Sequence, residues 1–194
     1  MKRRGDIAAN ARKRIREPLG EAALFEYAVA ALARRMRTER ELRRLMSLRA
    51  EAGEEGVRAM DAVIRRLKEM NYLSDARFAA DYTRLRKENE KLGRRRVQQD
   101  LAAKGVSPQL IATSVGAAYD DVDEEALARE YIARKRMKAP SGPDSKKQAA
   151  RAMGRLLRAG FSSATVFRVL RTWGVDADEI DLDDSGSLEN SDGE

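Results

Sequence analysis

Apolar residues recur at every third or fourth position through most of the chain, from residue 21 to residue 173. The residues between them are mainly Ala, Arg, Glu and Lys, which favour helices. No segment shows the alternation of apolar and polar residues that a half-buried strand would have. The pattern therefore predicts an all-α fold. One clear stripe with helical spacing consists of Val57, Met60, Val63, Ile64, Leu67 and Met70.

Start and stop signals divide this helical body into separate elements. Thr38 and Glu41 have the spacing of a capping box, and Ser74 is a good N-cap residue. Gly105 and Gly160 are suited to the left-handed conformation that ends many helices. These signals predict nine helices, at residues 21–36, 39–51, 54–70, 75–90, 93–104, 108–118, 124–138, 145–159 and 163–173.

The predicted helices repeat along the chain. A shift of 55 residues aligns residues 101–107 with 156–162, so that Leu, Gly, an apolar residue and Ser coincide. We predict three tandem three-helix repeats, at 21–73, 74–120 and 121–173, which stack in an elongated, curved array because each repeat alone would expose an apolar face. Further aligned pairs are Leu42 with Val97, Met46 with Leu101 and, at a shift of 49, Phe78 with Leu127, Tyr82 with Tyr131 and Lys87 with Arg136.

The amino-acid composition excludes several kinds of catalytic and metal-binding site. There is no Cys and no His, which excludes disulfides, thiol nucleophiles, imidazole bases and zinc fingers. No glycine-rich phosphate loop is present, and the acids at 120–125 are interpreted as complements to a helix dipole rather than as a metal site. No run approaches the roughly 18 apolar residues of a membrane span. We expect a cytoplasmic protein that is not an enzyme and uses no cofactor or metal.

Charge is divided unevenly along the chain. Residues 174–194 hold nine acidic and no basic side chains, so residues 1–173 carry 39 basic and 23 acidic side chains, a net charge of +16. Residues 1–20 are interpreted as a mobile basic arm and residues 174–194 as a disordered acidic tail. The basic body favours an anionic partner, although a solvated surface without a ligand would have the same composition.

Clusters of basic residues are the candidate contact sites. Lys91, Arg94, Arg95 and Arg96 surround Gly93 at a predicted helix start, where positive side chains oppose the helix dipole. A sequence shaped only by stability would avoid them, so this cluster is the first candidate, with a solvated charge run as the alternative. A secondary basic stripe along one side of the array would comprise Arg34, Arg35, Arg37, Lys135, Arg136, Lys147, Arg151 and Arg155. The aromatic residues Tyr72, Tyr82 and Trp173 have core spacing and are expected to pack inside.

Two segments resemble the RecX family. Residues 71–79, Asn-Tyr-Leu-Ser-Asp-Ala-Arg-Phe-Ala, resemble the family's Gly-Tyr-Leu-Asp-Asp-x-Arg-Phe-Ala. Residues 93–106 resemble its Gly-x-x-Arg-Ile-x-x-x-Leu-x-x-Lys-Gly-Ile segment. Asn71 replaces a usual Gly, and Asn is the next best residue for a left-handed helix end. The resemblance covers residues 22–173 and is most specific in the central repeat.

The resemblance implies a fold and a function. RecX proteins consist of three tandem three-helix repeats, bind along the groove of the RecA filament on single-stranded DNA, and restrain its recombinase and ATPase activity without cofactor or catalytic residues. By motif position, Arg94, Arg95, Arg96 and Lys104 are then expected to contact the filament, with weak direct DNA contact and a monomeric protein. The alternative is a sequence-tolerant helical DNA-binding protein that acts without RecA. An adaptor that uses the acidic tail is a third alternative.

Overall fold

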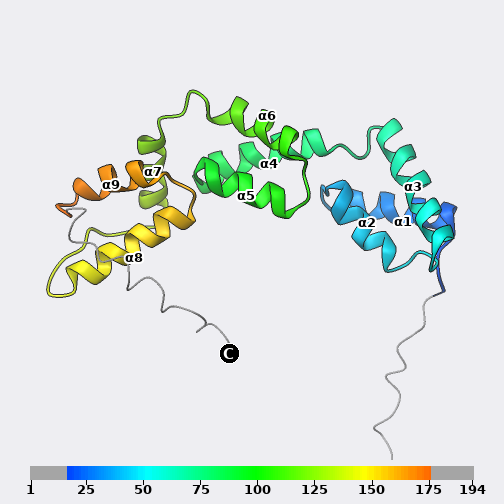
Figure 1. The fold of residues 1–194 in the computed structure, drawn as a ribbon, viewed down its shortest axis with the longest axis horizontal. Helices are drawn as coiled ribbons and strands as arrows, with labels where there is room; N and C mark the ends of the chain where they lie inside the picture. The colour runs from blue at the N-terminus through cyan, green and yellow to red at the C-terminus, as the bar shows by residue number, and fades with distance from the viewer. Residues whose placement is uncertain (1–16, 176–194) are drawn as a thin grey trace, which may run out of the picture. The chain divides into compact units, whose positions relative to one another are not determined.

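The apolar stripes and caps of the sequence produce helices throughout the part of the chain that the structure describes, residues 17–175 of this computed structural model (Figure 1). The all-α class is confirmed for these residues, while the mobile arm and the acidic tail lie largely outside them. The helices are α1 Glu21–Arg34, α2 Glu39–Ser47, α3 Glu54–Glu69, α4 Asp75–Glu90, α5 Arg94–Ala103, α6 Pro108–Tyr119, α7 Glu124–Arg134, α8 Ser145–Arg158 and α9 Ser163–Arg171.

Helix starts follow the predicted caps closely, whereas several helix ends come earlier than predicted. Thr38 and Glu41 form the capping box, and the Ser74 hydroxyl accepts the N–H of Arg77. Helix α2 ends at Ser47 because the next residues form a turn, whose Arg49 carbonyl accepts the N–H of Leu19 at 2.7 Å. An N-cap depends only on residues close to it in the sequence. The turn after α2, in contrast, has a hydrogen bond from Leu19, which lies before α1.

The described residues form two compact units, each with its own hydrophobic core. Unit 1 ends at Leu73 and contains α1–α3; unit 2 begins at Ser74 and contains α4–α9. In unit 1, α3 packs against both α1 and α2, and in unit 2, α6 packs on α4 and α5 while α9 packs on α7 and α8. The predicted repeat boundaries and the curvature stay predictions. None of the described helices has the length and apolar character that a membrane crossing requires.

Positions related by the 55-residue shift have the same structural role. Leu101 and Leu156 are both fully buried. Gly105 and Gly160 follow them with φ of 82° and 92°, in the left-handed region that glycine tolerates. The next serines, Ser107 and Ser162, each cap a helix by accepting a backbone N–H three residues on. The repeated sequence therefore encodes a repeated helix–turn–helix geometry.

Some predicted core positions are exposed. Val57 is 51% exposed and Met70 43%, because they lie in the first turn and just after the last residue of α3. Tyr72 is also exposed, so the expectation that it packs inside was wrong; it lies in the turn after α3. Trp173 is partly buried against the core of unit 2, as expected. Apolar periodicity thus identifies which face of a helix is buried. It does not show whether the residues at the helix ends are covered by neighbouring helices.

One aligned pair does not share a role. Lys87 lies inside α4, whereas Arg136 follows the end of α7 with a left-handed φ of 50°. Helix α4 has 16 residues and α7 has 11, so the alignment at a shift of 49 fails beyond the length of α7. The left-handed position that follows α4 is Lys91, with φ of 58°.

Leu101 tests the assigned core face. Leu101→Ala is expected to lower the free energy of unfolding of unit 2 by roughly 2 to 5 kcal/mol, because the side chain is fully buried and leaves a cavity. Gln99→Ala, on the exposed side of the same helix, is the matched control and should cost under about 0.5 kcal/mol. Urea unfolding followed by circular dichroism measures both. Equal losses would contradict the assigned face.

Candidate partner-binding surface

The start of α5, which carries the predicted arginine cluster, is joined through its backbone to the turn between α8 and α9. The N–H of Gly93 donates to the Ala159 carbonyl at 2.8 Å, and the N–H of Arg95 donates to the Gly160 carbonyl at 3.3 Å. A Cβ at Gly93 would overlap the Gly160 carbonyl group and lie 2.7 Å from the nitrogen of Phe161. Glycine at both positions therefore lets the two backbone segments meet.

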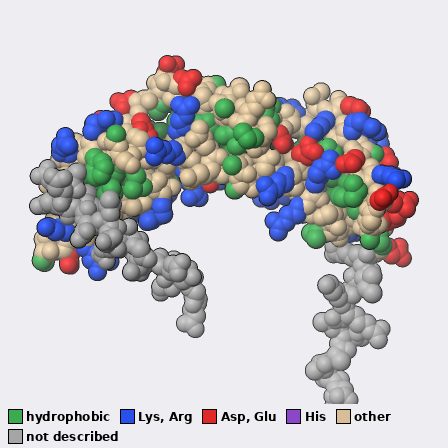
Figure 2. All heavy atoms as spheres, viewed as in Figure 1, with side chains coloured by type: hydrophobic (Ala, Val, Ile, Leu, Met, Phe, Trp, Pro, Cys, Tyr) green, Lys and Arg blue, Asp and Glu red, His purple; other side chains and the backbone are tan. Residues whose placement is uncertain are grey.

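The arginine cluster lies at the surface but has acidic neighbours. Arg94, Arg95 and Arg96 are all exposed in the first turn of α5. Arg94 Nη1 lies 3.7 Å from Asp120 Oδ1, and Arg96 Nε lies 2.9 Å from Asp100 Oδ1. Figure 2 shows acidic side chains in red among the blue Lys and Arg side chains on the surface. The cluster is accessible to a partner, and its positive charge is partly balanced within the chain.

The other two residues of the first candidate set differ in position and environment. Lys91 follows the last residue of α4, and its Nζ lies 2.6 Å from a carboxylate oxygen of Glu130. Lys104 ends α5, at the opposite end from Arg94 and about 15 Å along a ten-residue helix. Its ammonium group lies 5.6 Å from the centre of the Tyr82 ring. Lys91 is therefore near the arginine cluster in sequence, whereas Lys104 lies at the other end of α5.

Three residues of the secondary set belong to unit 1. Arg34 is the last residue of α1, and Arg35 follows it; both are exposed. Arg37 is half-buried, and its Nε donates to the Ala31 carbonyl at 3.3 Å. That bond closes the end of α1, so Arg37 has a structural role there in addition to its charge.

The remaining residues of the secondary set belong to unit 2. Lys135 and Arg136 are exposed just after α7. Lys147, Arg151 and Arg155 are all exposed on α8, where steps of four residues place them along one helix face. The predicted row on α8 therefore exists as a surface feature.

A groove joins members of the two candidate sets. Arg96 of α5 and Arg155 of α8 both line it, although they are 59 positions apart in sequence. Its volume is about 330 Å³. The groove is not predictable from the sequence because it depends on how α4, α5, α7 and α8 pack together. It is lined by Arg86, Glu90, Leu92, Arg96, Asp100, Tyr131, Arg155, Arg158 and Ala159.

Acidic side chains of residues 120–125 form hydrogen bonds at the starts of two helices, α7 and α9. The Asp123 side chain caps α7 by accepting the N–H groups of Glu125 and Ala126. One Glu124 carboxylate oxygen accepts the Ser162 hydroxyl at 2.6 Å, and the same oxygen accepts the Thr165 hydroxyl at 2.6 Å. Glu124 thereby ties the start of α7 to the start of α9. The interpretation of these acids as helix-start residues is confirmed for Asp123.

Glu124 gives a pH dependence. Burial alone would raise its pKa, but hydrogen bonds from Ser162 and Thr165, and the charge of Arg95, hold the pKa below its ordinary value. The folded protein therefore binds this proton less well than the unfolded chain, so the stabilisation is present at neutral pH and is lost as pH falls from about 5 through the folded pKa. Glu124→Gln should cost about 1 to 2 kcal/mol at pH 7 and progressively less at lower pH.

Denaturant unfolding of Glu124→Gln and the unsubstituted protein between pH 7 and pH 3 measures this difference. Glu88→Gln is the control, since Glu88 is exposed and its contact with Arg84 is long, at 3.5 Å. It should give a small, nearly constant difference. A Glu124→Gln penalty that does not shrink with falling pH would show that the charge of Glu124 is not what stabilises the contact.

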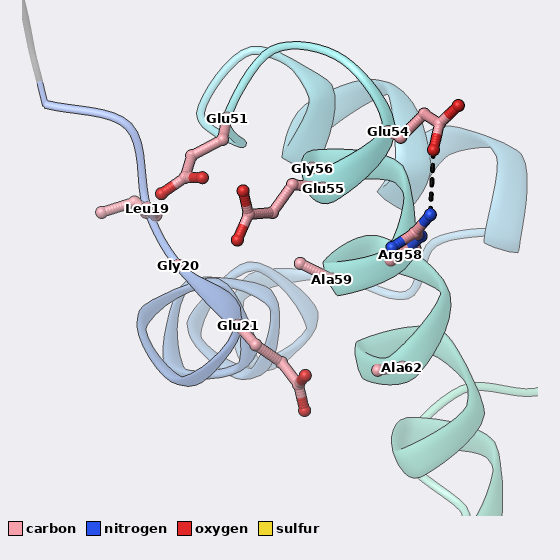
Figure 3. Close-up of a pocket in the computed structure, with 10 residues that line it drawn as sticks. All are labelled: Leu19, Gly20, Glu21, Glu51, Glu54, Glu55, Gly56, Arg58, Ala59 and Ala62. Carbon is pink, nitrogen blue, oxygen red and sulfur yellow. Dashed lines mark hydrogen bonds and ion pairs between the residues drawn. The ribbon is translucent and has the colours of Figure 1, made fainter.

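Unit 1 has an acidic groove between the segment that precedes α1 and the start of α3 (Figure 3). Its volume is about 680 Å³, and four glutamates line it. Two of them, Glu21 and Glu54, occupy first turns, where a carboxylate suits the helix dipole. Glu54 pairs with Arg58 at 2.9 Å. Within residues 17–175, no group of three or more acidic side chains is arranged to hold a metal ion.

Comparisons with known proteins agree with one another. The second three-helix domain of RecX matches residues 74–114. Regulatory protein RecX of Deinococcus radiodurans is 33% identical over 162 residues, covering 82% of this chain and 72% of that protein. Regulatory protein RecX of Streptomyces coelicolor is 34% identical over 113 residues, covering 58% of this chain and 59% of that protein. The match to the Streptomyces relative thus spans under two thirds of its length.

Solved structures show the same fold. The crystal structure of RecX from Lactobacillus salivarius superposes with a TM-score of 0.58 and covers 79% of this chain and 96% of that chain, at 18% sequence identity. A second crystal structure of regulatory protein RecX has a TM-score of 0.54 at 19% identity and covers 78% of this chain and 73% of that chain. At such identities the likeness shows the arrangement of helices and nothing further.

Proposed function

Because the chain belongs to the RecX family of regulatory proteins, we propose that it binds the RecA recombinase filament on single-stranded DNA and restrains its recombinase and ATPase activity. The observation that carries the proposal is the similarity to the RecX of Deinococcus radiodurans, which covers 82% of this chain. The protein would act by binding alone, as a monomer in the cytoplasm.

The position of the first candidate set supports this proposal. Lys91, the three arginines of α5 and Lys104 all lie in residues 74–114, the part that matches the RecX domain. The helix start that carries the three arginines is fixed by backbone hydrogen bonds to the turn between α8 and α9, so little backbone ordering would be required on binding. Asp120 and Asp100 partly neutralise the charges of Arg94 and Arg96. The resulting surface is better suited to bind a protein of mixed charge than a purely anionic polymer.

The proposed mechanism requires only that the protein binds two states of the filament with different affinities. A ligand that binds one state of a filament more tightly than another shifts the equilibrium toward that state by the difference in binding free energy. Preference for an inactive filament arrangement, or for dissociated protomers, would lower the rates of ATP hydrolysis and strand exchange. No catalytic residue in this chain is required.

Retention of the protein on immobilised RecA, with and without single-stranded DNA and ATP, tests the proposal. We expect retention only when both are present and the filament is assembled, together with slower ATP hydrolysis and only moderate sensitivity to salt. Equal retention on DNA alone, with a steep salt dependence, would instead support a DNA-binding protein that acts without RecA. Unchanged ATP hydrolysis at saturating protein would contradict inhibition.

A further inference from the structure

Helix α8 carries the least balanced charge of the helices in unit 2. Its 14 residues include five basic side chains and no acidic one. Its inner face is buried, whereas all five basic side chains are exposed. Among the described residues, none of the five forms an ion pair, in contrast to Arg94 and Arg96 of α5. Four of them lie along one face and are called the α8 row here: Lys147, Arg151, Arg155 and Arg158.

This arrangement works against the stability of the helix. Lys146 and Lys147 lie in the first turn, where the positive end of the dipole disfavours cations. The preceding Asp144 makes no capping hydrogen bond with its side chain. Like charges four residues apart, such as Arg151 and Arg155, repel each other. Arg155 and Arg158 lie in the last turn, where the dipole favours cations. The charges of Lys146, Lys147 and Arg151 have no such compensation and no ion-pair partner among the described residues, which points to an anionic ligand.

The α8 row continues into the groove that Arg96 and Arg86 line from the other side. Arg86 pairs with Glu90 and Arg96 with Asp100, so the positive charge of Arg155 and Arg158 remains unbalanced there. The two ends of the row, Lys147 and Arg158, are 11 positions apart, or about 16 Å along the helix. The groove has a volume of about 330 Å³. It has room for a phosphate and sugar of one strand.

Gly154 contributes to the position of one of these cations. A Cβ at this mid-helix position would lie 3.2 Å from Nη1 of Arg158. The bare backbone therefore lets the Arg158 guanidinium group lie back over α8.

We propose that the α8 row and its groove form a binding site for the phosphodiester backbone of single-stranded DNA. Cationic side chains about one helical turn apart would each neutralise a phosphate. The one aromatic side chain that lines the groove, Tyr131, is only 6% exposed, so bases have no stacking platform there and recognition is independent of sequence. This site goes beyond the proposed function, because its ligand is the nucleic acid and no recombinase is needed.

Fluorescence anisotropy with a labelled 20-nucleotide single strand of mixed sequence, without recombinase, tests the site. Replacing Lys147, Arg151, Arg155 and Arg158 together by Gln should raise the dissociation constant at least about tenfold at 50 mM salt. The slope of log affinity against log salt should fall by about 3, since each phosphate contact contributes about 0.7. The matched control removes four exposed arginines of unit 1, Arg40, Arg44, Arg58 and Arg65, and should change the affinity less than threefold.

A second variant separates binding from folding. Gly154→Ala should keep or raise the melting temperature because Ala favours a helix, yet weaken binding of the same strand about two- to fivefold by displacing the Arg158 side chain. Unchanged affinity in the fourfold variant, or an equal loss in the control, would overturn the proposal. Tighter binding of a 20-base-pair duplex than of the single strand would also overturn it. If the variant with all four substitutions binds DNA normally and loses only its action on the recombinase, the row is a protein contact and the proposal is wrong.

Discussion

Gly160→Ala is expected to lower the free energy of unfolding of unit 2 by roughly 2 to 6 kcal/mol, the sum of two separate penalties. Its φ of 92° is unfavourable for any residue with a Cβ. The new methyl group would also overlap the backbone nitrogen of Arg96 and lie 2.6 Å from the Arg96 Cβ. Relief requires α5 to move away from the α8–α9 turn and to lose the two backbone hydrogen bonds that join them.

Two further variants separate these penalties. Gly93→Ala introduces only the steric overlap, since Gly93 has an ordinary φ of −72°, and should cost about 1 to 3 kcal/mol. Gly142→Ala introduces only the left-handed strain, since φ is 74° and no atom lies within 4 Å of the new Cβ; it should cost about 1 to 2 kcal/mol. Urea unfolding measures all three. A Gly160→Ala loss no larger than that of Gly142→Ala would show that close approach at this junction is unnecessary.

Replacing Arg94, Arg95 and Arg96 together by Gln should weaken inhibition of RecA ATP hydrolysis at least about tenfold, if these side chains contact the filament as proposed. The fold should persist, because the three side chains are exposed and exposed ion pairs contribute at most about 1 kcal/mol each. Loss of cations from a helix start also removes an unfavourable dipole interaction. Gln is preferred to Glu because Glu would face Asp100 and Asp120.

The measurement is the protein concentration that halves ATP hydrolysis on single-stranded DNA. The control replaces Arg40, Arg44 and Arg65, which are exposed in unit 1, and removes the same charge from another surface. It should inhibit nearly as well as the unsubstituted protein. Equal weakening in both triple variants would indicate a general charge effect, and full inhibition by the α5 variant would remove this cluster from the contact surface.

The local signals in the sequence were sufficient for most of the fold. Thr38, Ser74, Ser107 and Ser162 are all caps in the structure, because an N-cap depends only on a side chain and the three residues after it. Helix ends were less predictable. The turn after α2 is held by Leu19, about 30 residues away, and no local pattern contains that contact.

The candidate site was predictable only as a set of charges. The sequence places Arg94 and Arg96 at a helix start, but it does not show that Asp120 lies beside one of them at the end of α6. The groove shared by Arg96 and Arg155 likewise exists only after the helices pack. Gly93 was interpreted as a helix start, whereas its closest constraint is the backbone of Gly160. Each of these facts depends on contacts between segments far apart in the chain.

The separate cores of the two units have a thermodynamic consequence. The unit ending at Leu73 and the unit beginning at Ser74 each bury their own apolar side chains, so we expect calorimetry to resolve a transition for each unit. A ligand stabilises only the folded body to which it binds, in proportion to the logarithm of its concentration. Calorimetry in the presence of an oligonucleotide or a recombinase would therefore show which body carries the contact, with the unshifted transition of the other body as an internal reference in the same scan.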